Sequence, residues 1–194
     1  MHSVVSHAYY PPQVRYQVNA RYMEKQPSIN AAMRTILIDW LVEVHKRFKL
    51  VQESLYLAVH ILDRFLDVHP IARNKLQLVG LGCLLVASKY EDTWPPRIGD
   101  LIFIADKAYT REEIISMELL VLEKLDHNLG CPMPLNFLRR YSKVADSDAE
   151  THTLAKYLLE ISLLDYDMCP FTYSQQAAAS LYLSREVFGQ QPWV

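Results

Sequence analysis

The chain has 194 residues, of which 51% are hydrophobic and 22% charged, a balance typical of a soluble globular protein of one large or two small domains. The formal net charge of −2 weighs against a nucleic-acid-binding protein, which usually carries a basic excess. Five glycines leave few turn residues for a large β-sheet. The three cysteines, Cys83, Cys131 and Cys169, share no metal-binding spacing. We therefore expect reduced thiols in an intracellular protein.

Residues 1–29 are predicted to form an irregular N-terminal segment. The YYPP run at Tyr9–Pro12 prevents a continuous early helix, and Pro27 interrupts the chain just before the first strongly patterned element. The opening residues contain no apolar run of the kind that begins a signal peptide.

The first predicted helix spans Ile29–Phe48 and holds more apolar residues than one stripe can accommodate. One face is made by Ile38, Leu41 and Val42. A second face follows the i, i+3, i+4, i+7 pattern and consists of Met33, Ile36, Leu37 and Trp40. Either this helix is sandwiched within the core, or one of its faces is a docking surface.

The second predicted helix, Gln52–Asp67, carries a carboxylate inside its apolar stripe. Asp63 lies between Val59 and Leu66 at helical spacing, and Arg34 is similarly embedded in the first helix. A buried charge without a partner costs several kcal/mol, so each of these residues requires the opposite charge nearby.

The third predicted helix, Lys75–Tyr90, is apolar on all sides, which indicates a helix buried in the centre of a bundle. It is too short to span a bilayer, which needs about 20 apolar residues. Gly80 and Gly82 lower its helix propensity by about 1 kcal/mol each. This cost predicts that neighbouring helices press close to its backbone.

A short helix near Ile98–Ala105 and a fifth helix over Arg111–Leu125 complete the first repeat, the latter opened by a capping box of Thr110 and Glu113. After Gly130–Pro134 the helical rhythm restarts, but without counterparts of the last two helices, which predicts an uncovered apolar face. The predicted later helices are Leu135–Ala145, Asp148–Leu164 and Thr172–Phe188. We expect an all-α fold with an N-terminal segment (1–29), one complete five-helix repeat (30–128), a linker (129–134) and an incomplete second repeat (135–194).

The sequence contains no motif that predicts catalysis, a metal site or a nucleotide cofactor. His45 and His60 lie on different helices without a second ligand at helical spacing, so we interpret them as satisfied or solvated histidines. Arg139, Arg140 and Lys143 are interpreted as a solvated helix face. The chain is therefore predicted to be a binding protein, with no catalytic residues, metal or cofactor of its own.

Several long segments resemble the cyclin box: Met33–Leu50 (MRTILIDWLVEVHKRFKL), Leu62–Leu66 (LDRFL), Lys75–Gly80 (KLQLVG) and Ala87–Asp92 (ASKYED). Two later ones, Pro134–Lys143 and His152–Met168, resemble the B-type, mitotic cyclins. The resemblance implies a cyclin fold with a truncated second box. It also implies a nuclear and cytoplasmic regulatory subunit that binds and activates a cyclin-dependent serine/threonine kinase controlling the G2/M transition and mitosis.

On this resemblance, Lys89 and Glu118 are the kinase-contacting pair. The same contact would be lined by Tyr90, Glu91, Leu122 and Leu125. The pattern alone leaves other interpretations open: Lys89 could complement a helix C-terminus, and Glu118 could be a polar residue at the edge of an apolar stripe.

The resemblance also implies a shallow patch that captures RxL-type substrates or inhibitors. Its residues would be Met33, Ile36, Leu37, Trp40, Glu43, Leu76 and Gln77. Without the resemblance, core packing is the default interpretation of Trp40. Arg34 and Asp63 match the family's internal ion pair.

Three features depart from the family pattern. His127 stands where related cyclins usually carry an aromatic residue at the kinase interface, the region before Arg21 does not resemble the N-terminal helix that normally packs on the kinase, and the second repeat is incomplete. One alternative is therefore a truncated, non-activating cyclin that acts as a kinase- or substrate-binding decoy. Another is a cyclin-fold transcription factor, against which the near-neutral charge weighs. We expect neither a nucleic acid nor a membrane as a partner.

Overall fold

The computed structural model describes residues 16–190, which form two compact units. One unit comprises residues 21–129, and the other comprises residues 16–20 together with 130–190. No strand occurs among the described residues, so the all-α prediction is confirmed there. The predicted break at Tyr9–Pro12 lies outside the described residues.

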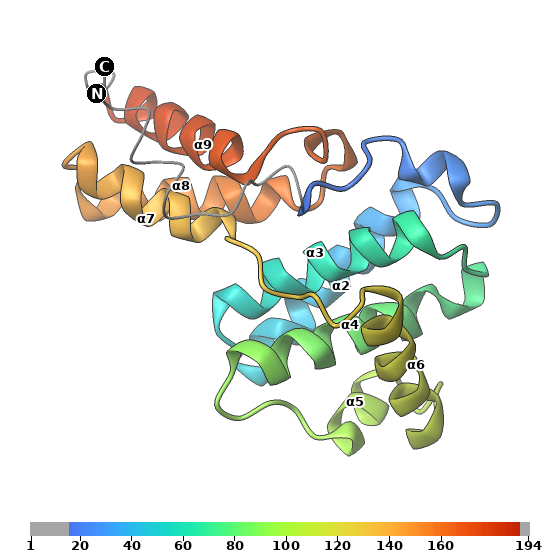
Figure 1. The fold of residues 1–194 in the computed structure, drawn as a ribbon. Coiled ribbons are helices and arrows are strands. Elements are labelled where there is room, and N and C mark those ends of the chain that lie inside the picture. Colours follow the sequence, from blue (N-terminus) through green and yellow to red (C-terminus); the bar gives the residue numbers. More distant parts are fainter. Residues whose placement is uncertain (1–15, 191–194) are drawn as a thin grey trace. The chain divides into compact units, whose positions relative to one another are not determined.

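The helices of the first unit follow the predicted order (Figure 1). They are η2 (Tyr22–Lys25), α2 (Ala31–Phe48), α3 (Gln52–Val68), η3 (Arg73–Lys75), α4 (Leu76–Glu91), α5 (Ile98–Ile104) and α6 (Arg111–Lys124). Side chains set several of their ends. The Asn30 side chain accepts a hydrogen bond from the Met33 N–H at 3.0 Å, and the predicted capping box of Thr110 and Glu113 opens α6.

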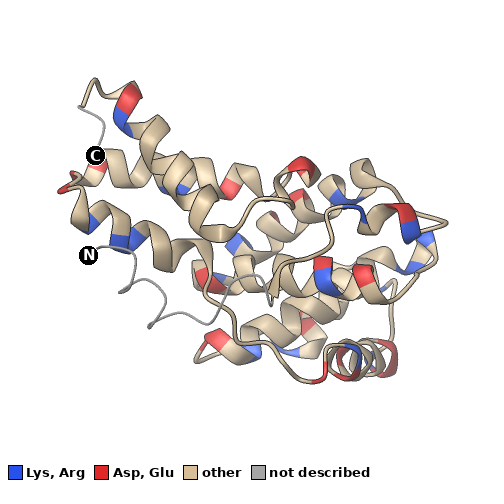
Figure 2. Ribbon diagram, turned by 45° about the horizontal axis from the view of Figure 1, so that its top comes forward, with Lys and Arg blue, Asp and Glu red and all other residues tan. Residues whose placement is uncertain are grey.

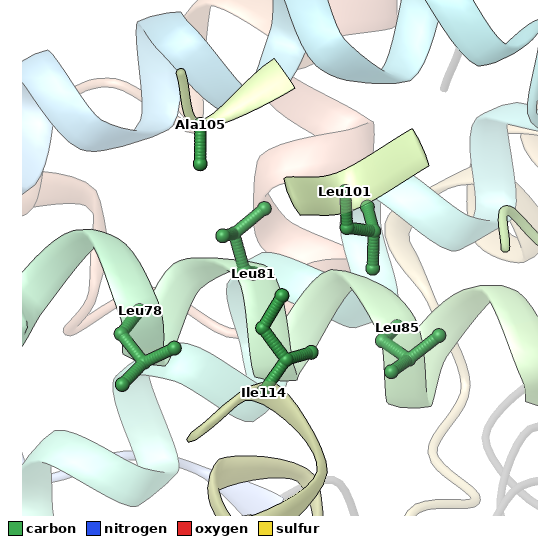
Figure 3. Close-up of a cluster of buried hydrophobic side chains, with 6 residues drawn as sticks. All are labelled: Leu78, Leu81, Leu85, Leu101, Ala105 and Ile114. Carbon is green, nitrogen blue, oxygen red and sulfur yellow. The ribbon is translucent and has the colours of Figure 1, made fainter. Parts of the chain in front are cut away.

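Helix α4 lies in the centre of this unit and packs against α2, α3 and α6. From Leu76 to Ser88 every residue except Gln77 is buried, which confirms the prediction of a helix buried on all sides. Figure 3 shows one part of this core, where the side chains of Leu78, Leu81 and Leu85 from α4 face Leu101 of α5 and Ile114 of α6.

The two glycines of α4 lie where neighbouring side chains come closest to its backbone. A Cβ atom at Gly80 would lie 2.8 Å from Leu37 Cδ1, and one at Gly82 would lie 2.8 Å from Met117 Cγ. Real Cβ contacts are not this short, so α2 and α6 could not pack as they do against a larger residue. The predicted close approach is confirmed.

A buried ion pair joins α2 to α3. Arg34 donates from Nε to Asp63 Oδ1 and from Nη2 to Asp63 Oδ2, both at 2.7 Å, and the Tyr22 hydroxyl donates to Oδ1 at 2.7 Å. Arg34 is only 2% exposed and Asp63 6%. The desolvation of each charge is thus offset by a bidentate partner and an added hydrogen bond, which also attaches η2 to the bundle.

The second unit contains α7 (Pro134–Val144), α8 (Ala149–Ser162), η4 (Tyr166–Met168) and α9 (Tyr173–Val187). Helix α9 packs against both α7 and α8. The preceding chain joins this unit through two hydrogen bonds, from Gln17 Nε2 to the Pro170 carbonyl at 2.6 Å and from the Tyr166 hydroxyl to the Ala20 carbonyl at 2.8 Å.

Helix α9 keeps an apolar stripe open to solvent, unlike α4. Tyr182 and Leu183 are each 50% exposed and Val187 is 63% exposed. They follow helical spacing along one face, so the structure shows the uncovered apolar face that the sequence predicts for the second repeat.

Candidate functional site

Lys89 and Glu118 meet at the surface of the first unit. Lys89 lies in the last turn of α4, where this otherwise buried helix reaches solvent, and Glu118 lies on the face of α6 that packs against α4. The Lys89 Nζ and Glu118 Oε1 atoms are 2.5 Å apart. The Lys89 side chain is 47% exposed but that of Glu118 only 11%, so a nearly buried carboxylate holds an accessible ammonium group in place.

The other predicted residues of this surface differ widely in accessibility. Tyr90 is 55% exposed, Glu91 is also exposed and Leu122 is partly buried, whereas Leu125 is only 4% exposed and lies beneath the surface. The sequence reasoning did not single out Leu119, which is 61% exposed beside Glu118. The sequence pattern does not reveal this exposure, because apolar residues occur on several sides of α6.

The end of α4 is fastened to the start of α3. Asp92, the first residue after α4, accepts a hydrogen bond from the Val51 N–H at 2.9 Å and another from the Ser54 hydroxyl. A ring nitrogen of His45, in the last turn of α2, lies 3.0 Å from the Val51 carbonyl oxygen. Asp92 thereby caps a helix whose own cap residue, Val51, makes no side-chain cap bond. The start of α3 is therefore joined both to the end of α4 and to the last turn of α2.

Negative charge concentrates at this joint. The pKa of Glu91 is raised above its usual value, first by partial burial and then by the carboxylates of Glu53 and Asp92. No lysine or arginine of the described residues forms an ion pair with Glu91. Elsewhere, Lys and Arg are interspersed with Asp and Glu along the ribbon of each unit (Figure 2).

The predicted docking patch lies on α2 and the start of α4. Ile36 is 71% exposed and Glu43 is exposed, whereas Leu37 and Leu76 are buried and Met33 is partly buried. Few side chains of the predicted patch therefore project into solvent.

The other two residues of the predicted patch, Gln77 and Trp40, contact neighbouring side chains of the first unit. Gln77 Oε1 lies 3.3 Å from the Tyr109 hydroxyl, which donates to it. Trp40 is partly buried and packs against the cluster of Figure 3, so its ring contributes to the core while one part remains accessible.

Other histidines and basic residues that the sequence brings forward lie in α3, on α7 and after α6. His60 is buried in α3 and its pKa is lowered to about 3, chiefly because burial disfavours the charged ring and also through Arg64. Arg139, Arg140 and Lys143 are exposed on α7, and His127 is exposed after α6.

The described residues also bear on two other kinds of site, a metal centre and a membrane span. Among them, no group of three or more His, Cys, Asp or Glu side chains is arranged to hold a metal ion. Within the same residues, no helix has both the length and the apolar character needed to cross a bilayer.

Comparison with known proteins assigns almost the whole chain to two family domains. The family described as "Cyclin, N-terminal domain" matches residues 5–130, and "Cyclin, C-terminal domain" matches residues 132–194. The G2/mitotic-specific cyclin-B2 of Oryzias javanicus is 54% identical over 176 residues, covering 91% of this chain and 46% of that protein. The human cyclin-B2 is 51% identical over 181 residues, covering 93% and 45%. The chain thus spans about half the length of the curated relatives it matches.

Solved structures share the fold at low sequence identity. A viral cyclin from herpesvirus saimiri superposes with a TM-score of 0.83 at 21% identity, covering 93% of this chain and 80% of that one. A chain of the yeast RNA Pol II CTD kinase complex superposes with a TM-score of 0.76 at 12% identity, covering 94% and 63%. Both likenesses support the predicted cyclin fold.

Proposed function

Because this chain belongs to the cyclin family, we propose that it is a B-type regulatory subunit that binds and activates a cyclin-dependent serine/threonine kinase. It would act at the G2/M transition and in mitosis, and it would perform no reaction of its own. The observation that carries the proposal is the surface ion pair of Lys89 and Glu118, beside exposed Tyr90 and Leu119. Its three free cysteines fit the nucleus and cytoplasm, where thiols stay reduced.

The mechanism would be a shift of the kinase's conformational population. An active kinase needs the ion pair between its β3 lysine and its αC glutamate in place. A regulatory subunit that binds the active arrangement more tightly than the inactive one shifts the equilibrium by its difference in affinity. The fixed geometry of the Lys89–Glu118 pair suits this task, since a rigid surface pays little ordering entropy on binding.

The test is to replace Lys89 and Glu118 together with alanine. We expect kinase binding to be lost while the helical circular dichroism remains, because the variant removes both charged groups proposed to contact the kinase, and truncating a residue at the energetic centre of an interface costs about 2 kcal/mol or more. Isothermal titration against a reconstituted mitotic cyclin-dependent kinase measures the affinity. A histone-kinase assay on the same pair then separates activation from binding alone.

The matched control is the other ion pair that joins the same region of the bundle. Lys75 Nζ lies 2.9 Å from Glu113 Oε1, with side chains 44% and 38% exposed. Lys75→Ala combined with Glu113→Gln should leave kinase affinity unchanged. Wild-type affinity in the Lys89→Ala, Glu118→Ala variant would refute the assignment.

We also propose that the patch around Ile36 captures RxL-type peptides. Ile36 is the best residue for the test because its side chain is 71% exposed, so truncating it removes little buried apolar area from the fold. Ile36→Ala should weaken binding of a fluorescent RxL peptide roughly tenfold, the cost expected of a central apolar contact, and should leave kinase affinity intact. Trp40→Ala should weaken the peptide further, but with some loss of stability. Unchanged fluorescence polarisation with Ile36→Ala would reject the patch.

A further inference from the structure

Trp94 is an unexplained feature of the first unit. Its side chain is 87% exposed, the largest exposed fraction among the large apolar side chains of the described residues. It lies in the loop between α4 and α5, just before Pro95–Pro96. A tryptophan left almost wholly in water contributes nothing to the core, whereas tryptophan is among the residues most enriched at the energetic centres of interfaces.

The loop that carries Trp94 begins at a fixed point. Asp92, two residues before it, is bonded to the Val51 N–H and the Ser54 hydroxyl, and the ring of His45 is bonded to the Val51 carbonyl. Proline at the two following positions further restricts the backbone. The backbone that carries the exposed ring is thus restrained before a partner arrives, so ordering this loop on binding would cost little entropy.

The charges next to Trp94 select a cationic partner group. Glu91 lies three residues before it, is exposed, and has no lysine or arginine partner in the described part of the chain. Glu53 and Asp92 add negative charge and help to raise the pKa of Glu91. A positive group brought from outside would remove this mutual repulsion, and a ring face beside it would attract the same cation.

Resting on the function proposed above, we infer that Trp94 and Glu91 together receive an arginine side chain of the bound kinase. The guanidinium group would stack on the indole face and donate hydrogen bonds to the Glu91 carboxylate. Arginine fits better than lysine because its planar group stacks on aromatic rings and pairs with carboxylates through two parallel bonds. This contact would extend the kinase surface from the Lys89–Glu118 pair along the chain that leaves α4.

The experiment compares substitutions that separate the ring face from plain hydrophobic area. The affinity of the reconstituted kinase is measured for Trp94→Ala, Trp94→Leu and Trp94→Phe. We expect alanine and leucine to weaken binding about tenfold or more, and phenylalanine to weaken it by less than about threefold, since only phenylalanine keeps a π-face for the cation. Phe103→Ala is the control, because Phe103 is an aromatic 64% exposed on α5, and it should leave the affinity unchanged.

A double-mutant cycle tests whether one arginine serves both residues. Glu91→Gln alone should weaken binding several-fold. Combined with Trp94→Ala, the loss should be smaller than the product of the two single losses, because the second substitution removes a contact that has already been broken. Losses that multiply fully would overturn the shared arginine.

A direct readout on Trp94 itself completes the design. In 5-fluorotryptophan-labelled protein, the ¹⁹F resonance that Trp94→Phe removes should shift and lose its solvent-isotope effect when kinase is added. A resonance that stays solvent-exposed in the complex, or Trp94→Leu at wild-type affinity, would overturn the inference while the Lys89–Glu118 assignment stands. Failure of the wild-type chain to bind kinase would overturn both. Sedimentation showing a dimer of the free chain that Trp94→Ala dissociates would assign the ring to a second copy instead.

Discussion

The charged residues of this protein form ion pairs of two kinds. Some pairs are buried in the core, and others lie at the surface, where a partner can reach them. Arg34 and Asp63 share two hydrogen bonds in the core, and both residues are buried where no partner protein could reach them. Lys89 and Glu118 make one contact at the surface, and the Lys89 side chain remains 47% exposed. The difference in exposure, rather than the pairing itself, distinguishes the structural pair from the candidate binding pair.

His60 predicts a pH dependence of stability at the residue scale. Its pKa in the folded protein is about 3, below the usual 6.5. The unfolded state therefore binds more protons between these two pH values. The stability that the neutral His60 ring contributes is complete above pH 6.5 and is lost as the pH falls through that window. Between pH 7.5 and 5.5 the loss should be about 1.4 kcal/mol. In urea unfolding, the free energy of unfolding of His60→Gln should change less between these two pH values than that of the wild type, and the difference should be this amount.

A packing control keeps this result specific to protonation. Val59 is 3% exposed on the same helix, and Val59→Ala removes buried methyl groups without removing a titrating ring. It should lower the free energy of unfolding at both pH values and preserve the wild-type difference between them. If His60→Gln preserved that difference too, the buried ring would not be its source.

At the scale of elements, the helices were predictable because local signals define them. The capping box at Thr110 and the apolar pattern of α4 are contained within short stretches of sequence. The cap on α3 was not predictable, since it comes from Asp92, 41 residues along the chain. The burial of Leu37, Leu76 and Leu125 depends similarly on which neighbouring helix covers each side chain. Sequence periodicity identifies an apolar face but not what packs against it.

The close packing of α6 against α4 can be measured with two glycine substitutions. Both Gly82→Ala and Gly99→Ala favour the helical state by up to about 1 kcal/mol. A Cβ at Gly82 meets Met117, however, whereas one at Gly99 meets nothing within 4 Å. Gly99→Ala should therefore raise the free energy of unfolding, and Gly82→Ala should fall below it by about 1–3 kcal/mol, the usual cost of overpacking. Adding Met117→Ala should recover part of the difference, and equal effects of the two alanines would contradict the close approach.

At the scale of the whole molecule, all the candidate binding residues belong to one unit. Lys89, Glu118, Ile36 and Trp94 lie within residues 21–129, together with the ion pair of Arg34 and Asp63. No sequence pattern indicated that residues 16–20 join the other unit, because that assignment depends on hydrogen bonds to Pro170 and Tyr166 far along the chain. The first unit contains its own buried core and all the residues proposed to contact a kinase or a peptide.

Because all the candidate binding residues lie in one unit, we predict that residues 21–129 bind the kinase as an isolated fragment. The fragment should unfold cooperatively, since the buried helix α4 and the helices around it are all retained. It should bind the kinase within about tenfold of the full chain, because the Lys89–Glu118 pair and Trp94 are unchanged. Calorimetric unfolding and titration against the kinase measure both. A fragment that unfolds cooperatively but does not bind would show that an essential part of the interface lies in the second unit. If the fragment binds, and Lys89→Ala with Glu118→Ala abolishes that binding, the affinity of the fragment depends on this pair.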